Sequence, residues 1–338
     1  MINFRNDYSD IAHPVILEKL MTLKHEKNIG YGLDKHSEQA KVLIQNHFSS
    51  AVDIHLMGGG TITNKTVISH LLRPYEAVIA ADTGHIFVHE TGAIEQTGHK
   101  IIAVDAPYGK LSIDLVDQVI KSHTDEHMVK PKMVYISNST ETGFIYTKTE
   151  LMDLYKYTQK QGLYLFVDGA RLGVALTAKE NDLTLDFVRE CSDCFYIGGT
   201  KNGALLGEAL IIKDKALSEY FRYSVKQNGG LLAKGFLVGI QFECLFTDNL
   251  FFEIGYLANH ASTLLKEKLE GLNIGFKPTP TNQQFITLDN RVVETLSKNY
   301  LFEIWTDLGK QKTIRLVTTY QTTAAEIHQF IQDLSDLL

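Results

Sequence analysis

The sequence has few cysteines, few prolines and no long hydrophobic run. Three cysteines among 338 residues are too few, and odd in number, for a disulfide framework, so we expect a reducing, cytoplasmic setting. No apolar segment approaches the roughly 20 residues that span a bilayer. The chain turns polar at Arg5, so we expect neither a membrane segment nor a signal peptide. Cys191 and Cys194 have the spacing of a zinc half-site without a second pair, so we predict packed thiols and no metal site.

Positive charge is also scarce. The 33 Lys and Arg residues are outnumbered by 40 Asp and Glu residues, which leaves a net charge of −7. Nucleic acids and anionic membranes are bound through clustered positive charge, so we expect neither as a partner. The hydrophobic fraction of 44% and the charged fraction of 22% are those of an ordinary globular protein, and the length suffices for a large domain and a smaller one.

Short β-rich runs alternate with helical-period stretches between residues 50 and 215. This alternation is typical of βαβ units, so we predict an α/β domain with a large, mostly parallel, seven-stranded sheet covered by helices on both faces. The predicted strands are Val52–Met57, Ala77–Ala81, Lys100–Val104, Lys132–Ser137, Leu163–Val167, Cys194–Gly198 and Glu208–Ile212. The predicted helices are Thr61–Leu72, Ile86–Glu95, Ser112–Ser122 and Lys148–Gln161.

The pattern changes toward both ends of the chain. Helices are expected at residues 13–20, with Pro14 in the first turn, and at residues 36–48. Later segments are predicted as helices at Leu231–Phe246, Phe251–Leu269 and Ala324–Leu337, a Pro/Gly break at Gly275–Pro280, and strands at Gln284–Leu288, Leu301–Trp305 and Thr313–Thr318. We therefore expect a large domain over residues 1–248 and a small α+β domain over residues 249–338.

A glycine turn follows the first predicted strand. Gly58, Gly59 and Gly60 precede Thr61, where a helix is expected to begin, so free backbone N–H groups would face an anion such as phosphate. The spacing is not that of a Walker loop. A turn that only permits close packing is an equally good interpretation of these glycines alone.

Two further motifs follow strands of the predicted sheet. Asp168 ends an apolar strand, at the edge where open α/β sheets bind ligands, and Arg171 lies three residues on. A structural ion pair is the alternative for these two. Lys201 lies in a glycine-rich turn after the next strand, and a desolvated lysine becomes an amine nucleophile able to form an imine, although most lysines are surface charges. A phosphate turn, a strand-end aspartate and a turn lysine are together the groups needed to hold pyridoxal phosphate.

These motifs resemble the threonine aldolase and β-eliminating lyase family of fold-type I pyridoxal-phosphate enzymes. The similarity runs in order along nearly the whole chain, through Arg5–Ser9, Tyr31–Asp34, Gly59–Asn64, His85, Glu90–Ala93, Thr140–Gly143, Val167–Arg171, Lys201 and Ile314–Thr318. It is greater to the low-specificity, phenylserine-type branch. The resemblance implies an amino-acid substrate and the cofactor pyridoxal 5′-phosphate.

The resemblance also implies a role for individual residues at the cofactor. Lys201 resembles the Schiff-base lysine, and Thr200 would offer a hydroxyl to the phosphate beside Gly59, Gly60 and Thr61. Asp168 resembles the partner of the pyridine nitrogen, and Arg171 the arginine at the ring's phenolate oxygen. His85 matches the imidazole that stacks on the ring, and it is equally a candidate base for the β-hydroxyl proton.

Other residues are expected at the substrate and at a subunit interface. Arg315 is similar to the arginine that grips the substrate carboxylate, and Asn6 and Ser9 belong to a segment that approaches the same group. Tyr31 and Lys226 resemble residues that reach the cofactor pocket across an interface, which implies a homodimer or homotetramer.

The chain departs from better-known threonine aldolases at two places. Tyr8 stands where those enzymes have a threonine, and Glu141, near the substrate's β-substituent, stands where they have a second histidine. The expected reaction is retro-aldol cleavage of an L-threonine or L-allo-threonine type substrate to glycine and an aldehyde, with Lys201, His85 and Asp168 as catalytic residues. The alternatives are β-elimination, transamination or racemisation of another amino acid, and a non-catalytic protein with this fold.

Overall fold

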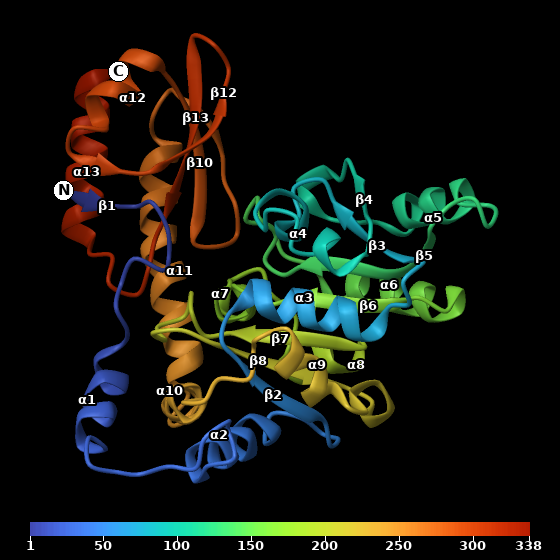
Figure 1. Cartoon of the computed structure of the whole chain (residues 1–338). Coiled ribbons are helices and arrows are strands. Elements are labelled where there is room, and N and C mark those ends of the chain that lie inside the picture. Colours follow the sequence, from blue (N-terminus) through green and yellow to red (C-terminus); the bar gives the residue numbers. More distant parts are fainter.

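The computed structural model describes residues 1–338. A seven-stranded sheet forms the core of the larger of its two lobes (Figure 1). The strands are β2 (Asp53–Met57), β3 (Glu76–Ala81), β4 (Ile101–Val104), β5 (Lys130–Ser137), β6 (Tyr164–Asp168), β7 (Cys194–Gly198) and β8 (Glu208–Ile212). They lie in the order β2-β8-β7-β6-β5-β3-β4. All pairs are parallel except those of β8, which is antiparallel to β2 and β7. The prediction of seven strands in a mostly parallel sheet is confirmed.

Both faces of this sheet are buried under hydrophobic clusters. Successive side chains of a strand point to opposite faces, so each strand contributes to both clusters. In β7, Phe195 and Ile197 pack in one hydrophobic cluster, while Cys194 and Tyr196 pack in another. The helices that cover the faces are α3 (Gly60–Leu71), α4 (His85–Val88), α5 (Ile113–Ser122), α6 (Lys148–Gln161), α7 (Leu172–Thr177), α8 (Leu185–Glu190) and α9 (Phe221–Gln227). Short 3₁₀ turns lie at η1 (Glu95–Thr97), η2 (Pro107–Gly109) and η3 (Lys215–Ser218). The continuous apolar strands of the sequence thus reflect burial on two sides.

Local capping explains where α6 begins and ends. Thr147 and Glu150 form a reciprocal capping box, and Gly162 ends the helix in the left-handed conformation, as predicted. The helix predicted over Ile86–Glu95 is wrong, because α4 stops at Val88 and the chain then turns through Thr91, which has a φ of 51°.

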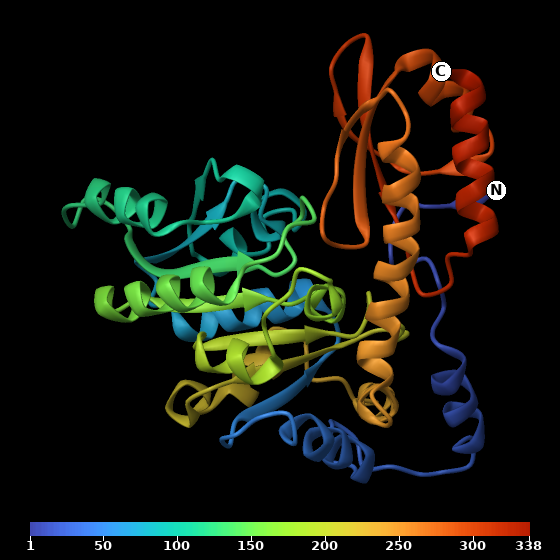
Figure 2. The same ribbon diagram turned by 180° about the vertical axis from the view of Figure 1, so that it is seen from behind.

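The C-terminal lobe contains an antiparallel sheet in the order β12-β13-β10-β9. Its elements are α11 (Leu250–Glu270), β9 (Gly275–Lys277), β10 (Gln283–Asp289), α12 (Asn290–Leu296), β11 (Tyr300–Leu301), β12 (Glu303–Asp307), β13 (Gln311–Val317) and α13 (Ala324–Leu337). The preceding helix α10 (Phe236–Phe246) packs in the hydrophobic cluster of the large sheet instead. Helices α11 and α13 lie side by side against the sheet (Figure 2). The predicted Pro/Gly break at Gly275–Pro280 is partly wrong, because its first three residues form strand β9. Helix α12 was not predicted. Helix α10 begins five residues later than expected.

The N-terminal segment joins this C-terminal lobe before it crosses to the large sheet. Strand β1 (Ile2–Asn3) pairs in parallel with β11, and Phe4 is fully buried in the C-terminal hydrophobic cluster. Helices α1 (Pro14–Thr22) and α2 (Lys35–Gln45) follow, and α2 packs on α10. The division at residue 248 stays a prediction. None of the helices has both the length and the apolar character that a membrane span requires.

Candidate active site

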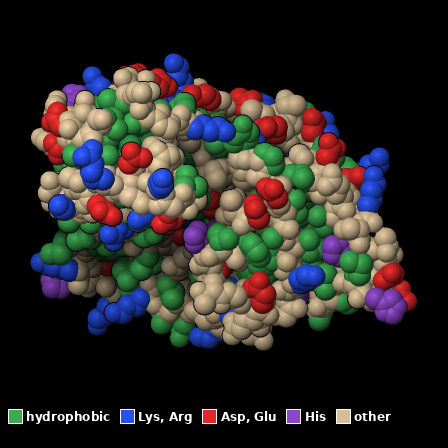
Figure 3. Space-filling view, turned by 90° about the horizontal axis from the view of Figure 1, so that it is seen from above, with side chains coloured by type: hydrophobic (Ala, Val, Ile, Leu, Met, Phe, Trp, Pro, Cys, Tyr) green, Lys and Arg blue, Asp and Glu red, His purple; other side chains and the backbone are tan.

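A cavity of about 270 Å³ lies where the strands of the large sheet end. The carboxyl end of β7 points toward the C-terminal lobe (Figure 1), and the view from above shows a hollow between the two lobes (Figure 3). Nine residues predicted from the sequence line this cavity, namely Gly59, Gly60, Thr61, His85, Glu141, Asp168, Arg171, Thr200 and Lys201. The structure therefore brings together groups that lie up to 142 positions apart, from Gly59 to Lys201, along the chain.

The glycine turn leaves space for an anion at the start of α3. The first N–H groups of a helix have no partner within it, so those of α3 face the cavity end of the helix. A Cβ added at Gly59 would meet no atom within 4 Å, so any side chain there would enter open space at the cavity wall. At Gly58, in contrast, a Cβ would press on Leu232 at 3.3 Å, so close packing explains that glycine.

Asp168 is held rigidly at the end of β6. Its Oδ1 accepts a hydrogen bond from the backbone N–H of Ala170 at 2.9 Å. Its Oδ2 accepts from the hydroxyl of Tyr135 and, at 3.4 Å, from Nδ2 of Asn64. The side chain is 4% exposed. These hydrogen bonds fix the orientation of the carboxyl group at the cavity wall.

Lys201 and Arg171 line the cavity, and Arg171 forms an ion pair with Asp7, which lies outside the lining. Asp7 accepts two hydrogen bonds from Arg171, one from Nε at 2.6 Å and one from Nη2 at 3.0 Å, and both residues are buried. Burial alone would raise the pKa of Asp7, but the charges of Arg171 and Lys201 lower it below the usual value. The pKa of Lys201 is lowered by burial first and by Arg171 second. The Lys201 ammonium has no ion-pair partner and lies 5.9 Å from the ring centre of Tyr8. Tyr8, which stands where better-known threonine aldolases have a threonine, is therefore beside the lysine.

His85 contacts two buried acidic residues, Glu90 through its imidazole and Glu141 through its backbone N–H. Its Nδ1 lies 2.8 Å from Oε1 of Glu90, which also accepts from Nδ2 of Asn64 at 2.8 Å. Its backbone N–H donates to Oε1 of Glu141 at 3.0 Å, and the Ser137 hydroxyl donates to the same oxygen at 2.7 Å. Burial raises the pKa of Glu141. A carboxylate only accepts, so a neutral His85 facing an ionised Glu90 would carry its proton on Nδ1 and keep a free lone pair on Nε2.

Arg315 lies on β13 in the C-terminal lobe, outside the residues that line the cavity. It forms an ion pair with Glu303, and its Nη1 donates to Oε1 of Gln283 at 3.1 Å. Its buried Nε has no partner. Asn6 and Ser9 also lie outside the cavity lining, and the Ser9 hydroxyl donates to Asn6 at 2.8 Å. Their contact with a substrate carboxylate stays a prediction.

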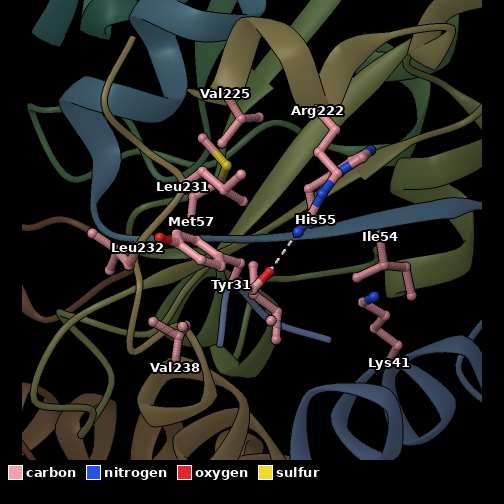
Figure 4. Close-up of a pocket in the computed structure, with 13 residues that line it drawn as sticks. Tyr31, Lys41, Ile54, His55, Met57, Arg222, Val225, Leu231, Leu232 and Val238 are labelled. Atoms are coloured by element: carbon pink, nitrogen blue, oxygen red, sulfur yellow. Dashed lines mark hydrogen bonds between the residues drawn. The ribbon is translucent and has the colours of Figure 1, made fainter. Parts of the chain in front are cut away.

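Neither Tyr31 nor Lys226 lines the cavity. Tyr31 lines a separate small pocket, and Lys226 lies beside Tyr31. Tyr31 is 43% exposed, and the Lys226 ammonium lies 5.0 Å from the centre of its ring. Figure 4 shows Tyr31 beside Leu232 and Met57, with Arg222 donating to the Tyr31 carbonyl at 2.8 Å. Met57 immediately precedes the glycine turn, so this pocket adjoins the anion end of the cavity from outside.

Sequence reasoning missed four residues of the site. Asp7 and Glu90 were within motifs of the family resemblance but had no assigned role, and Tyr135 and Glu208 carried no signal at all. Glu208 is 4% exposed and lines the cavity. Pairing between remote residues such as Asp7 and Arg171 depends on tertiary contact and has no periodic pattern in the sequence. No group of three His, Cys, Asp or Glu side chains is arranged to hold a metal ion.

Known proteins match this chain along most of its length. The profile of the β-eliminating lyase family matches residues 9–300. A low specificity L-threonine aldolase of Pseudomonas sp. (strain NCIMB 10558) is 28% identical over 337 residues, which is 97% of this chain and 95% of that protein. The corresponding enzyme of Saccharomyces cerevisiae is 26% identical and covers 85% of this chain and 75% of its own.

Solved structures are similar to this chain over its whole length. The structure of Leishmania major threonine aldolase superposes with a TM-score of 0.98 at 44% identity, over 100% of this chain and 99% of that one. A Thermus thermophilus aspartate aminotransferase has a TM-score of 0.75 at 13% identity, with 100% and 92% of the two chains covered, which shows the fold-type I architecture alone. The chain therefore belongs to the β-eliminating lyase family.

Proposed function

We propose that this chain cleaves an L-β-hydroxy-α-amino acid of the L-threonine or L-allo-threonine type to glycine and an aldehyde, with pyridoxal 5′-phosphate as its cofactor. The observation that supports this most is the convergence of Lys201, Asp168 and Arg171 with the glycine turn in one cavity. Two relatives that are named threonine aldolases and match 97% and 100% of this chain support the same reaction.

The cavity fits this cofactor by the chemistry of its walls. Gly59 leaves an open cradle at a helix N-terminus for the phosphate, with Gly60 and Thr61 beside it. Lys201 would hold the aldehyde carbon, Asp168 the protonated ring nitrogen, and Arg171 the ring oxygen. Pyridoxal phosphate, when bound, supplies an electron sink for the pair released as a bond to the amino acid's Cα breaks.

The proton movements are assigned to residues whose environment suits them. Burial lowers the pKa of Lys201, so its amine is more easily deprotonated and nucleophilic. His85 is the base for the substrate's β-hydroxyl proton, because Glu90 holds the proton on Nδ1 and leaves Nε2 free. Asp168, held by its three donors, would face the ring nitrogen.

Substrate recognition is assigned to the C-terminal lobe. A guanidinium binds a carboxylate with two parallel hydrogen bonds, and such a grip fixes which Cα bond is broken. Arg315 offers its unpaired Nε for this purpose, and a substrate carboxylate would compete with Glu303 for the rest. Asn6 and Ser9 would approach the same carboxylate. Glu141, beside His85, would face the β-substituent.

We also propose that the active unit is a homodimer or a larger homo-oligomer, in a reducing cytoplasmic compartment. Exposed apolar side chains line both pockets, Leu206 the cavity and Leu232 the small pocket with Tyr31. Leu205, Tyr220 and Tyr223, close to lining residues in the sequence, are exposed too. Such a surface is typical of an interface. Tyr31 and Lys226 would then reach the cavity of the second copy. Three buried free cysteines support the reducing setting.

The test is a substrate panel on the cofactor-loaded protein. Threonine, allo-threonine and phenylserine are offered, and glycine and aldehyde are quantified. Release of both from at least one substrate, lost in Lys201→Ala, is the expected result. Absence of glycine from all three would refute the aldolase assignment, and pyruvate or ammonia would favour β-elimination, which the glutamate at position 141 makes the main rival.

The shared site is tested by mixing two inactive variants, Lys201→Ala and Lys226→Ala. Random pairing gives hybrids with one intact site in two, so about a quarter of the unmutated activity should return. No recovery after subunit exchange would place Lys226 outside the partner's site.

A further inference from the structure

Glu208 is a buried carboxyl group at the anion end of the cavity. It opens β8, where it pairs with Gly198 of β7 on one side and with Met57 of β2 on the other. Met57 leads into the Gly58–Gly60 turn, and Gly198 leads into Thr200 and Lys201. The carboxyl group therefore lies between the two turns that are expected to hold the cofactor phosphate, and it is 4% exposed.

The hydrogen bonds of Glu208 come only from neutral donors. Its Oε2 accepts from the Gly199 N–H at 2.9 Å, and its Oε1 accepts from the Thr200 hydroxyl at 2.9 Å. The Thr200 hydroxyl accepts in turn from the Gly207 N–H at 3.0 Å, so its single proton is already directed at Glu208. No lysine or arginine forms an ion pair with Glu208. The nearest cation, Lys201, acts on it only through space.

A charged carboxylate at this place would repel a phosphate. The anion cradle at α3 and the carboxyl group line one cavity, and the carboxyl group is buried, so solvent screens their interaction only weakly. The pKa of Glu208 is raised to about 8. Burial is the main cause and Asp168 adds to it, while the Thr200 and Gly199 hydrogen bonds and Lys201 act in the opposite direction. The titratable groups that face it are Lys201, Asp168 and Tyr196, whose own pKa is raised by burial.

We propose that Glu208 is a further cofactor-binding residue, which as a neutral carboxylic acid donates a hydrogen bond to a phosphate oxygen held at the glycine turn. Each of its oxygens accepts only one hydrogen bond from the protein, so a proton on either oxygen is free to point into the cavity. No covalent bond forms or breaks, and the proton stays on Glu208. The inference rests on the proposed use of pyridoxal phosphate.

The sign of the pH dependence follows from this arrangement. A ligand that binds the protonated form loses affinity as the pH rises through the pKa of the free protein. With that pKa near 8, binding of the phosphate should be about tenfold weaker at pH 9 than at pH 7. Deprotonation of Lys201 would act in the same direction, so a comparison with a variant that keeps Lys201 is needed.

The experiment measures binding of pyridoxine 5′-phosphate, which has no aldehyde and forms no bond with Lys201, to the full chain between pH 6.5 and 9.5. Calorimetry gives the affinity, and the ³¹P resonance of the bound phosphate reports its surroundings. Glu208→Gln is the test variant, because its amide can still accept from Gly199 and donate to Thr200. Glu219→Gln, on the exposed surface, is the matched control. Thermal unfolding checks that each variant is folded.

The expected result is a tenfold loss of affinity from pH 7 to pH 9 in the unmutated chain and in Glu219→Gln, and at most a twofold loss in Glu208→Gln. Equal pH dependence in all three would overturn the role of Glu208 while leaving the proposed function intact. Failure of the unmutated chain to bind either this probe or pyridoxal phosphate at any pH would instead overturn the proposed function, and this inference with it.

Discussion

The orientation of His85 depends on a single buried carboxylate. Glu90 has no exposed side-chain surface, and its Oε1 accepts from both His85 and Asn64 at 2.8 Å. A carboxylate only accepts, so an ionised Glu90 would place the proton of a neutral His85 on Nδ1 and leave Nε2 as the proposed base. Glu90→Gln replaces one acceptor oxygen by a donor. If that donor faces His85, the tautomer is reversed and Nε2 can no longer take a proton.

The size of the effect follows from the lost interaction. A hydrogen bond to a charged group contributes roughly 1.5 to 3 kcal/mol. Because about 1.4 kcal/mol corresponds to a factor of ten in rate, we expect kcat to fall about 10- to 150-fold in Glu90→Gln. Glu90 does not line the cavity, so KM should change little.

The assay is steady-state cleavage of allo-threonine and threonine at pH 7 with saturating cofactor. Glu95→Gln, five residues on and exposed, is the control and should keep the unmutated kcat. The cofactor absorbance of Glu90→Gln should also be unchanged, which separates a positioning effect from loss of the cofactor. A normal kcat in Glu90→Gln would refute the reasoning and leave His85 with a stacking role only.

Three further predictions concern other parts of the site. Asp7→Asn should lower the free energy of unfolding in urea at pH 7 by about 3 to 5 kcal/mol, because Arg171 would stay buried without its counter-charge. Since the pKa of Asp7 is lowered, this difference should be fully present above the ordinary value of 3.8 and shrink as the pH falls below it; a constant difference would contradict the pairing. Gly59→Leu should fold normally by circular dichroism yet bind pyridoxal phosphate at least tenfold more weakly, and normal binding would refute the cradle. Arg315→Lys should raise KM for the amino acid about tenfold or more through loss of bidentate contact, and an unchanged KM would remove Arg315 from the substrate site.

Much of the large sheet is predictable because its signals are local. Strands such as β7, buried on both faces, appear in the sequence as unbroken apolar runs, and Gly162 ends α6 where the pattern places a stop. The errors occur where tertiary contacts override local preference. The segment after α4 leaves the helix because Glu90 turns inward to meet His85 and Asn64, and β9 forms at Gly275–Lys277 because β10 offers an edge to pair with.

The site divides along the same line. Residues that follow a strand or open a helix, such as Asp168, Lys201 and the glycine turn, are found from their position alone. Residues that act through a remote partner are not, and Asp7, Glu90 and Glu208 became visible only with their contacts to Arg171, His85 and Thr200. A buried charge whose partner lies more than 150 positions away, as between Asp7 and Arg171 (164 positions), leaves no periodic trace.

The N-terminal segment couples the two lobes across the cavity. Ile2 pairs with Tyr300 of the C-terminal lobe, and Phe4 packs in that lobe's core. Three residues later Asp7 binds Arg171 of the sheet lobe, while Asn282 of the C-terminal lobe donates to the same carboxylate at 3.1 Å. A single carboxylate thus ties Arg171, which lines the cavity, to the lobe that bears Arg315. If Arg171 and Arg315 hold the cofactor and the substrate as proposed, loss of Asp7 would disturb the alignment of the two lobes as well as the stability of the fold.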